Sequence, residues 1–184
     1  ESVAARFRGG RDLKCPSLPF RVLTGKKMAK VGIALSGGGA RGFAHVGVLK
    51  ALIENDIAID LVSGVSAGSF VGGAIAAGMT IDEIVELGAK IGWRRVAGFS
   101  YSPRGLLSSA SMGTLIEKNF PVTRFEDLKL PFAAVACDLE TGDEVVMRDT
   151  GDLAFAIRAS CAIPGVFVPM VDKRGRSLID CGAG

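Results

Sequence analysis

Residues 59–68 read IDLVSGVSAG, and this stretch is the strongest indication of the fold class. Its first half, Ile59–Ser63, has the composition of a short β-strand, and its second half, Gly64–Gly68, fits G-x-S-x-G with Ser66 at the centre. A serine on a sharp strand-to-helix turn projects its hydroxyl clear of the sheet, and the flanking glycines permit that turn. The helix N-terminus also offers free N–H groups to an anion. The stretch therefore predicts a strand, a nucleophile turn and a small-residue helix around Ser69–Ala77.

The same order of strand, glycine turn and helix occurs just upstream. Lys30–Leu35 (KVGIAL) is rich in strand-forming residues, Ser36–Gly42 (SGGGARG) follows it, and Ala44–Asn55 has an apolar face at helical spacing. Two such units in succession predict an α/β fold with a mainly parallel sheet. Ligands in such sheets bind beyond the C-terminal ends of the strands, so both glycine turns would face one crevice.

Further elements are expected along the rest of the chain. Thr80 can cap a helix from Ile81 to about Gly92, because Glu83 stands at the capping-box position. The Ser-, Gly- and Pro-rich stretch Ser100–Ser111 is expected to be a loop long enough to act as a lid or substrate loop. The other expected elements are a short helix over Ser111–Asn119, a buried strand over Phe132–Cys137, its antiparallel partner over Glu144–Arg148, a helix over Asp152–Ser160 and a strand at Leu178–Ile179.

The upstream glycine turn is a candidate oxyanion hole. Three successive glycines, Gly37, Gly38 and Gly39, can direct adjacent backbone N–H groups toward one point, which is the arrangement that stabilises a developing oxyanion. Arg41 would either add positive charge or hold the loop by bonding backbone carbonyls. A tight connection that only packs closely is the alternative interpretation, and the nearby serine turn makes it the weaker one.

A nucleophilic serine needs a base. The one histidine, His45, follows the first glycine turn, and a single histidine there is more typical of a structural role. Asp180 is the stronger candidate, because it follows the apolar pair Leu178–Ile179 and would end a strand on the side of Ser66. A buried carboxylate can accept the hydroxyl proton directly. The alternatives are aspartates more typical of caps and turns, namely Asp60, Asp138, Asp143 and Asp149.

Charge and cysteine content narrow the class of protein. The net charge is +3, yet residues 1–30 carry eight basic and two acidic side chains. A basic tail can touch anionic lipid or nucleic acid, but we expect residues 1–29 to be a solvated, poorly ordered terminus or an expression remnant, with no nucleic-acid partner. The four cysteines show no metal-ligand or redox-pair spacing, which fits a reducing, cytoplasmic compartment. The apolar stretches are too short for a membrane span.

Taken together, these motifs resemble the signature blocks of the patatin-like phospholipases, in their bacterial branch. The blocks are Gly37–Gly42 (GGGARG), Gly64–Gly68 (GVSAG), Ala159–Phe167 (ASCAIPGVF) and Asp180-x-Gly182, and the resemblance runs from about Lys30 to the C-terminus. It implies a three-layer α/β/α fold over residues 30–184 and a lipid acyl hydrolase that needs no metal or cofactor. By the same resemblance, Ser66 is the nucleophile and Asp180 the base of a Ser-Asp dyad. The amides of Gly37, Gly38 and Gly39, with Arg41 nearby, form the oxyanion hole.

The expected substrate is a phospholipid or lysophospholipid ester, reached through transient contact with a membrane surface. Trp93 and Leu106–Leu107 suggest an apolar cleft for acyl chains, and ordinary core packing is an equally good interpretation of them. Two departures stand out: Cys181 replaces the family's usual glycine after the aspartate, and the chain stops four residues after Asp180, where the family continues, so the domain is expected to be truncated.

Two functions other than acyl hydrolysis each agree with part of the sequence. A non-catalytic lipid-binding or regulatory relative has Cys181 as its only support. A dinucleotide-binding protein would explain Gly37, Gly39 and Gly42 as G-x-G-x-x-G. In that fold the ribose-binding acid ends the second strand, whereas Asp60 begins it.

Overall fold

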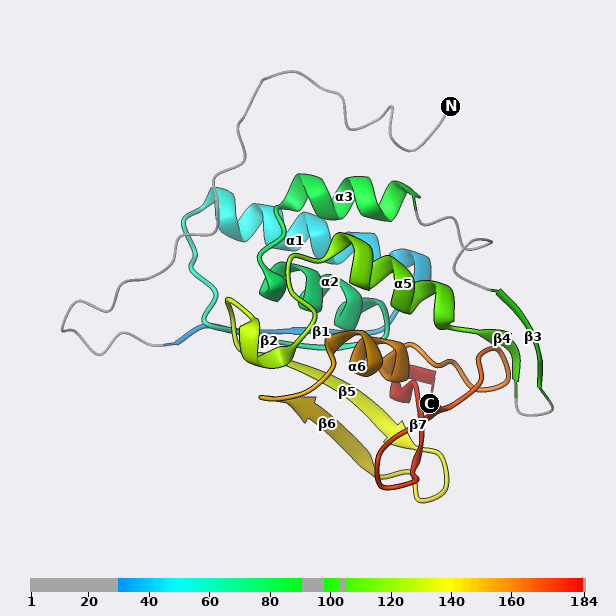
Figure 1. The fold of residues 1–184 in the computed structure, drawn as a ribbon. Coiled ribbons are helices and arrows are strands. Elements are labelled where there is room, and N and C mark those ends of the chain that lie inside the picture. Colours follow the sequence, from blue (N-terminus) through cyan, green and yellow to red (C-terminus); the bar gives the residue numbers. More distant parts are fainter. Residues whose placement is uncertain (1–29, 91–97, 103–104, 184) are drawn as a thin grey trace.

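The computed structural model describes residues 30–90, 98–102 and 105–183. The predicted basic tail, residues 1–29, lies outside this part of the chain. A six-stranded mixed sheet organises the described residues (Figure 1). Its strands lie in the order β1 (Gly32–Leu35), β2 (Leu61–Val65), β5 (Phe132–Asp138), β8 (Ser177–Ile179) and β7 (Met170–Val171), and β6 (Glu144–Arg148) also pairs with β5.

The strand directions confirm the predicted α/β fold. β1, β2 and β5 run parallel to one another, with Leu35 opposite Gly64 and Val65 opposite Val135. β6 and β8 pair antiparallel with β5, and β7 pairs antiparallel with β8 at the edge of the sheet. The β5–β6 pair was predicted from the sequence, whereas the short strand β7 was not.

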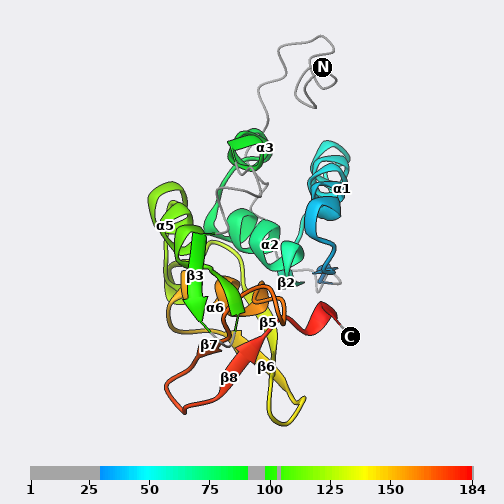
Figure 2. The ribbon, with the colours of Figure 1, turned by 90° about the vertical axis from the view of Figure 1, so that its right-hand side faces the viewer.

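All the described α-helices lie on one side of the sheet (Figure 2). They are α1 (Phe43–Glu54), α2 (Ala67–Ala77), α3 (Ile81–Lys90), α5 (Ala110–Asn119) and α6 (Leu153–Ser160), with short 3-10 turns η2 (Gly39–Gly42), η3 (Phe125–Asp127) and η4 (Cys181–Ala183). α2 and α6 pack against the strands, and the other α-helices pack against α2 or α6. The opposite face carries Leu61 and Val146, which are 43% and 48% exposed. The described residues thus supply the sheet and one helical layer.

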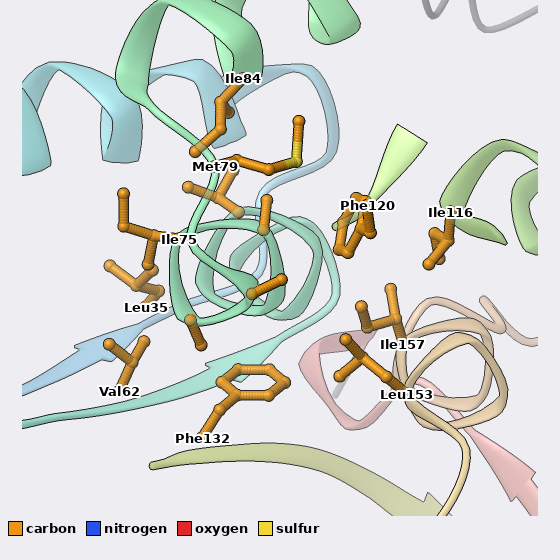
Figure 3. Packing of buried hydrophobic residues seen from close by; sticks show 14 of the residues in the cluster. Leu35, Val62, Ile75, Met79, Ile84, Ile116, Phe120, Phe132, Leu153 and Ile157 are labelled. Atoms are coloured by element: carbon orange, nitrogen blue, oxygen red, sulfur yellow. The ribbon is translucent and has the colours of Figure 1, made fainter. Parts of the chain in front are cut away.

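Small residues allow α2 to lie directly against the sheet. A Cβ on Gly72 would come within 2.9 Å of Val62 and 3.0 Å of Phe132, and one on Gly73 would come within 2.7 Å of Ile157. Any larger side chain would push the helix away from β2, β5 and α6. Figure 3 shows the resulting core, with side chains from the sheet, α2 and α6 meeting around the small-residue helix.

Helix α3 begins as its sequence predicts. The backbone N–H and hydroxyl of Thr80 donate to the Glu83 carboxylate at 2.7 and 2.9 Å, and the Glu83 N–H donates back to the Thr80 hydroxyl at 3.3 Å. These bonds lower the pKa of Glu83. No helix within residues 30–90, 98–102 and 105–183 is long and apolar enough to cross a bilayer.

The loop predicted over Ser100–Ser111 is the main error. Two antiparallel strands, β3 (Gly98–Ser102) and β4 (Gly105–Ser108), occupy most of it, and α5 begins already at Ala110. The strand-forming Phe99 and Tyr101 lie among serines and glycines, so composition alone concealed the alternation that favours a hairpin. β2 also extends two residues beyond its predicted end, to Val65, and α2 starts at Ala67.

Candidate active site

Ser66 occupies the single residue between β2 and α2. Its φ of 53° and ψ of −124° place a non-glycine residue at positive φ, as a nucleophile elbow requires. The two motif glycines make this turn possible. A Cβ on Gly64 would lie 2.4 Å from the carbonyl oxygen of Gly68, and one on Gly68 would lie 2.2 Å from the carbonyl oxygen of Leu35. The strand, the elbow and the helix therefore pack at backbone distance.

Buried side chains from α2 and α6 hold the backbone of Ser66. The Ser66 N–H donates to Ser160 Oγ at 2.9 Å, and Ser160 Oγ donates to the Val135 carbonyl at 2.6 Å. The Ser66 carbonyl accepts from Ser69 Oγ at 2.7 Å and from Cys161 Sγ at 3.2 Å. Ser160 and Ser69 are fully buried. Sequence reasoning assigned Ser160 no role, and its position in the ASCAIPGVF block was the only signal.

Asp180 follows β8, which lies in line with β2. β6 pairs with one edge of β5 from Ala133 to Cys137, so β2 and β8 share the other edge. β2 ends with Val65 opposite Val135, and β8 approaches from the opposite direction with Ile179 opposite Cys137. The residues that follow these strands, Ser66 and Asp180, therefore converge on the same level of β5.

The glycine loop and the C-terminal turn bring the two side chains into one site. A Cβ on Gly37 would lie 3.9 Å from Ser66 Oγ and 3.9 Å from Gly182 Cα. The Gly182 N–H donates to Asp180 Oδ1 at 2.8 Å, and the Asp180 N–H donates to the Ala162 carbonyl at 3.0 Å. Ser66 is 7% and Asp180 4% exposed. Among the described residues no hydrogen bond joins Ser66 Oγ to the Asp180 carboxylate; such bonds commonly tighten only when substrate is bound.

The candidate oxyanion loop rests on the start of α2. A Cβ on Gly42 would lie 2.6 Å from the Cβ of Ala67, and Gly39 has a φ of 52°, in the region that favours glycine. The Arg41 N–H donates to the Gly38 carbonyl at 2.9 Å, while the Arg41 side chain is exposed. His45 Nε2 donates to the Ser36 carbonyl at 2.8 Å, so this histidine ties α1 to the loop.

The alternative aspartates are engaged in local structure. Asp60 Oδ2 accepts from the Val31 N–H at 2.7 Å, before β2 begins. Asp138 Oδ1 accepts from the Glu140 N–H at 3.0 Å in the turn after β5. Asp143 and Asp149 are exposed turn residues. These are the cap and turn roles that the sequence favours for them.

An apolar pocket of about 130 Å³ opens beside Ser66. Figure 2 shows α2 between α1 and α5, with α3 above it, and these helices form the pocket walls. The side chains of Trp93 and Leu106–Leu107, expected to line a cleft, lie outside the described part of the structure. The lining residues are Gly39, Ala40, Gly42, Phe43, Val46, Ser66, Ala67, Phe70, Val71, Ile84, Gly88, Met112, Leu115, Cys161, Ile163 and Phe167.

The cysteines near the site are neutral thiols. Burial raises the pKa of Cys161 to about 12, and burial together with the neighbouring Cys137 thiol raises that of Cys181 to about 12. Because the thiolate is the nucleophilic form, neither competes with Ser66 at neutral pH. Within the described ranges, no three His, Cys, Asp or Glu side chains gather as a metal site would need.

The chain resembles known proteins in family, sequence and fold. The family model "Patatin-like phospholipase" matches residues 33–184. An uncharacterized NTE family protein of Mycobacterium bovis is 38% identical over 161 residues, which cover 86% of this chain and 44% of that protein. A patatin-like phospholipase domain-containing protein of Caenorhabditis elegans is 35% identical over 170 residues, covering 88% of this chain and 12% of that protein. The chain thus spans less than half the length of these relatives.

The fold agrees with these matches. The crystal structure of VipD from Legionella pneumophila superposes with a TM-score of 0.69 at 16% identity, covering 83% of this chain and 46% of that one. This likeness confirms the predicted patatin-like α/β/α fold, of which the described residues supply the mainly parallel central sheet and the helices on one side. Since the family model extends over the described domain and bacterial relatives exceed 30% identity, the chain belongs to the patatin-like phospholipase family.

Proposed function

We propose that this protein is a serine acyl hydrolase that cleaves carboxylic ester bonds of phospholipids or lysophospholipids through a Ser66–Asp180 dyad. The observation that carries the proposal is the convergence of β2 and β8 on one edge of β5, which leaves Ser66 and Asp180 at the same level beside an apolar pocket. Family membership supports the same class of reaction.

In the first half of the reaction, Asp180 takes the proton of Ser66 Oγ while that oxygen attacks the ester carbonyl. The amides of Gly37, Gly38 and Gly39 would stabilise the oxyanion of the tetrahedral intermediate. As the intermediate collapses, the bond from the carbonyl carbon to the alcohol oxygen breaks. The proton on Asp180 passes to that oxygen, and the acyl group stays on Ser66.

In the second half, Asp180 removes a proton from a water molecule that attacks the acyl-serine carbonyl. Collapse of the second intermediate breaks the bond to Ser66 Oγ, which recovers its proton from Asp180. The products are a free fatty acid and the alcohol portion of the lipid. Arg41 is exposed, so its charge reaches the oxyanion through solvent and contributes less than the backbone donors.

The surface near the pocket supports transient contact with a lipid surface. Phe43, which lines the pocket, is 55% exposed, and Val166, next to the lining residue Phe167, is 39% exposed. Exposed apolar side chains next to a binding pocket are a common feature of interaction sites. We propose that these two residues contact lipid while the ester enters the pocket.

The two competing functions have weaker support. A Cβ at position 181 leaves the bond from the Gly182 N–H to Asp180 Oδ1 intact, so Cys181 does not distort the aspartate turn as a decayed site would require. Asp60 binds the Val31 N–H ahead of β2 and lies away from the strand end where a ribose ligand belongs.

Hydrolysis of p-nitrophenyl acyl esters by the purified chain tests the proposal. Ser66→Ala should abolish turnover, and Asp180→Asn should lower kcat by about a thousandfold, because the serine loses its base. Asp138→Asn is the matched control: it changes another buried aspartate at a strand end and should retain most activity. Full activity in Ser66→Ala would rule the proposal out.

A further inference from the structure

The pocket beside Ser66 is closed at one end by the hydrophobic core. Val46 from α1, Val71 from α2 and Ile84 from α3 line it and are 5%, 6% and 2% exposed. All three also belong to the main core cluster. The rim residue Phe43 is 55% exposed. A ligand can therefore extend from Ser66 only until it meets these three side chains.

The floor of the pocket sets the direction of a bound chain. Ala67, Phe70 and Val71 line the pocket at spacings of three and four residues, so they lie on one face of α2. This face begins directly after Ser66 and leads to Val71 after about one helical turn. An acyl group esterified to Ser66 would follow α2 toward the closed end.

The chemistry of the walls admits a hydrocarbon chain. Among the described residues that line the pocket, only Ser66 has a side-chain oxygen, only Met112 and Cys161 have a sulfur atom, and none carries a charge. A pocket with such walls favours an alkyl chain and disfavours sugars or charged headgroups. The headgroup side of the ester must therefore remain toward the rim.

We propose that the closed end of this pocket selects medium-chain acyl groups and that Val46, Val71 and Ile84 set the chain-length limit; this inference rests on the proposed acyl hydrolase function. The cavity of about 130 Å³ is slightly smaller than the cavity of about 150 Å³ that holds a benzene ring. It has room for about six carbons. Longer chains must displace core side chains or leave part of the alkyl chain in water.

A series of p-nitrophenyl esters from acetyl to dodecanoyl tests this limit through kcat/KM. The kcat/KM of the wild-type protein should be highest for acyl groups of about six carbons and about tenfold lower for the longest esters. Ile84→Ala removes part of the closed end and should move the peak to longer chains. Val46→Phe fills the same end and should move the peak to shorter chains.

Leu87→Ala is the matched control for Ile84→Ala. Leu87 lies on the same helix and is 3% exposed, but it does not line the pocket, so its truncation should reduce stability and leave the preferred chain length unchanged. Thermal melting of each variant shows whether it is folded.

The outcomes separate the two proposals. If the protein hydrolyses esters but neither Ile84→Ala nor Val46→Phe changes the preferred chain length, the chain-length limit is wrong and the hydrolase function stands. The same conclusion follows if Leu87→Ala changes the preferred chain length as much as Ile84→Ala does. Failure of the folded wild-type protein to hydrolyse any ester of the series overturns the hydrolase function, and the limit with it.

Discussion

At the scale of single residues, the carbonyl of Ser66 has more hydrogen-bond partners than its N–H. Its N–H has one described partner, Ser160 Oγ. Its carbonyl accepts from the Ser69 and Phe70 N–H groups as well as from Ser69 Oγ and Cys161 Sγ. Because Ser66 is held at positive φ, the loss of an anchor that has no substitute should allow the elbow to relax.

Ser160→Ala should therefore damage the site more than Ser69→Ala. The first change leaves the Ser66 N–H and the Val135 carbonyl without this partner, at a cost of about 1–3 kcal/mol of stability. Misplacement of Ser66 Oγ should also lower kcat by about ten- to a hundredfold while KM changes little. Ser69→Ala, also at a fully buried position, should lose far less kcat, and equal losses in the two variants would contradict the anchoring role.

At the scale of elements, close backbone packing is what brings α1, α2 and the first two strands together. Glycine is required where a helix meets a strand at backbone distance, as at Gly68 against Leu35. Glycine is not required at Gly47, in the middle of α1, where a Cβ would meet no atom within 4 Å. Both positions are glycines, but there is no space for a Cβ at Gly68 and there is open space for one at Gly47.

Substituting alanine at each position should give stability changes of opposite sign. Gly68→Ala should destabilise the protein by about 3 kcal/mol or more, because its Cβ overlaps rigid backbone. Gly47→Ala should stabilise it by about 0.5–1 kcal/mol, because alanine loses less conformational entropy in a helix. Urea unfolding measures both, and a stabilising Gly68→Ala would refute the close approach of α2 to β1.

The stability of the link between η3 and the turn before α6 depends on pH with a sign that can be derived. Glu126 in η3 accepts hydrogen bonds from its own N–H, from Gly151 N–H and from the Arg124 guanidinium, and these bonds lower its pKa from 4.5 to about 2. A carboxylate with a depressed folded-state pKa contributes stability above its unfolded pKa and loses it as pH falls through the folded value. The contribution of Glu126 is therefore complete above about pH 4.5 and lost between pH 4.5 and 2.

Glu126→Gln should melt below the wild-type temperature at pH 7, and the difference should shrink as pH falls toward 2.5. Thermal melts monitored by circular dichroism between these pH values measure the effect. Glu140→Gln removes an exposed carboxylate from the β5–β6 turn and controls for the loss of charge alone. A difference between wild type and Glu126→Gln that is constant across the range would show that the carboxylate has no depressed pKa.

At the scale of the whole molecule, 114 positions separate Ser66 from Asp180, yet the sheet places them at one level of β5. The sequence predicts β1, β2, β5, β6, β8 and both glycine turns, because periodicity and turn chemistry are local signals. It does not reveal that β8 enters antiparallel, on the edge that β2 vacates. That arrangement depends on which strand edges remain unpaired once β5 has formed.

The features missed from the sequence share a physical cause. The bonds from Ser160 to Ser66 and Val135 join residues 94 and 25 positions apart, and no local pattern encodes such contacts. The β3–β4 hairpin was missed because turn-forming residues outnumber its strand formers. The pocket required the packing of four helices, which cannot be read from any one of them.

Reaction of the folded chain with a fluorophosphonate ester, followed by peptide mass spectrometry, shows whether Ser66 is a nucleophile activated by Asp180. We expect one covalent adduct per chain, on Ser66, absent in Ser66→Ala and formed much more slowly in Asp180→Asn because the attacking oxygen loses its base. An unmodified Ser66 in a protein shown to be folded, or an adduct that forms at the same rate in Asp180→Asn, would contradict it.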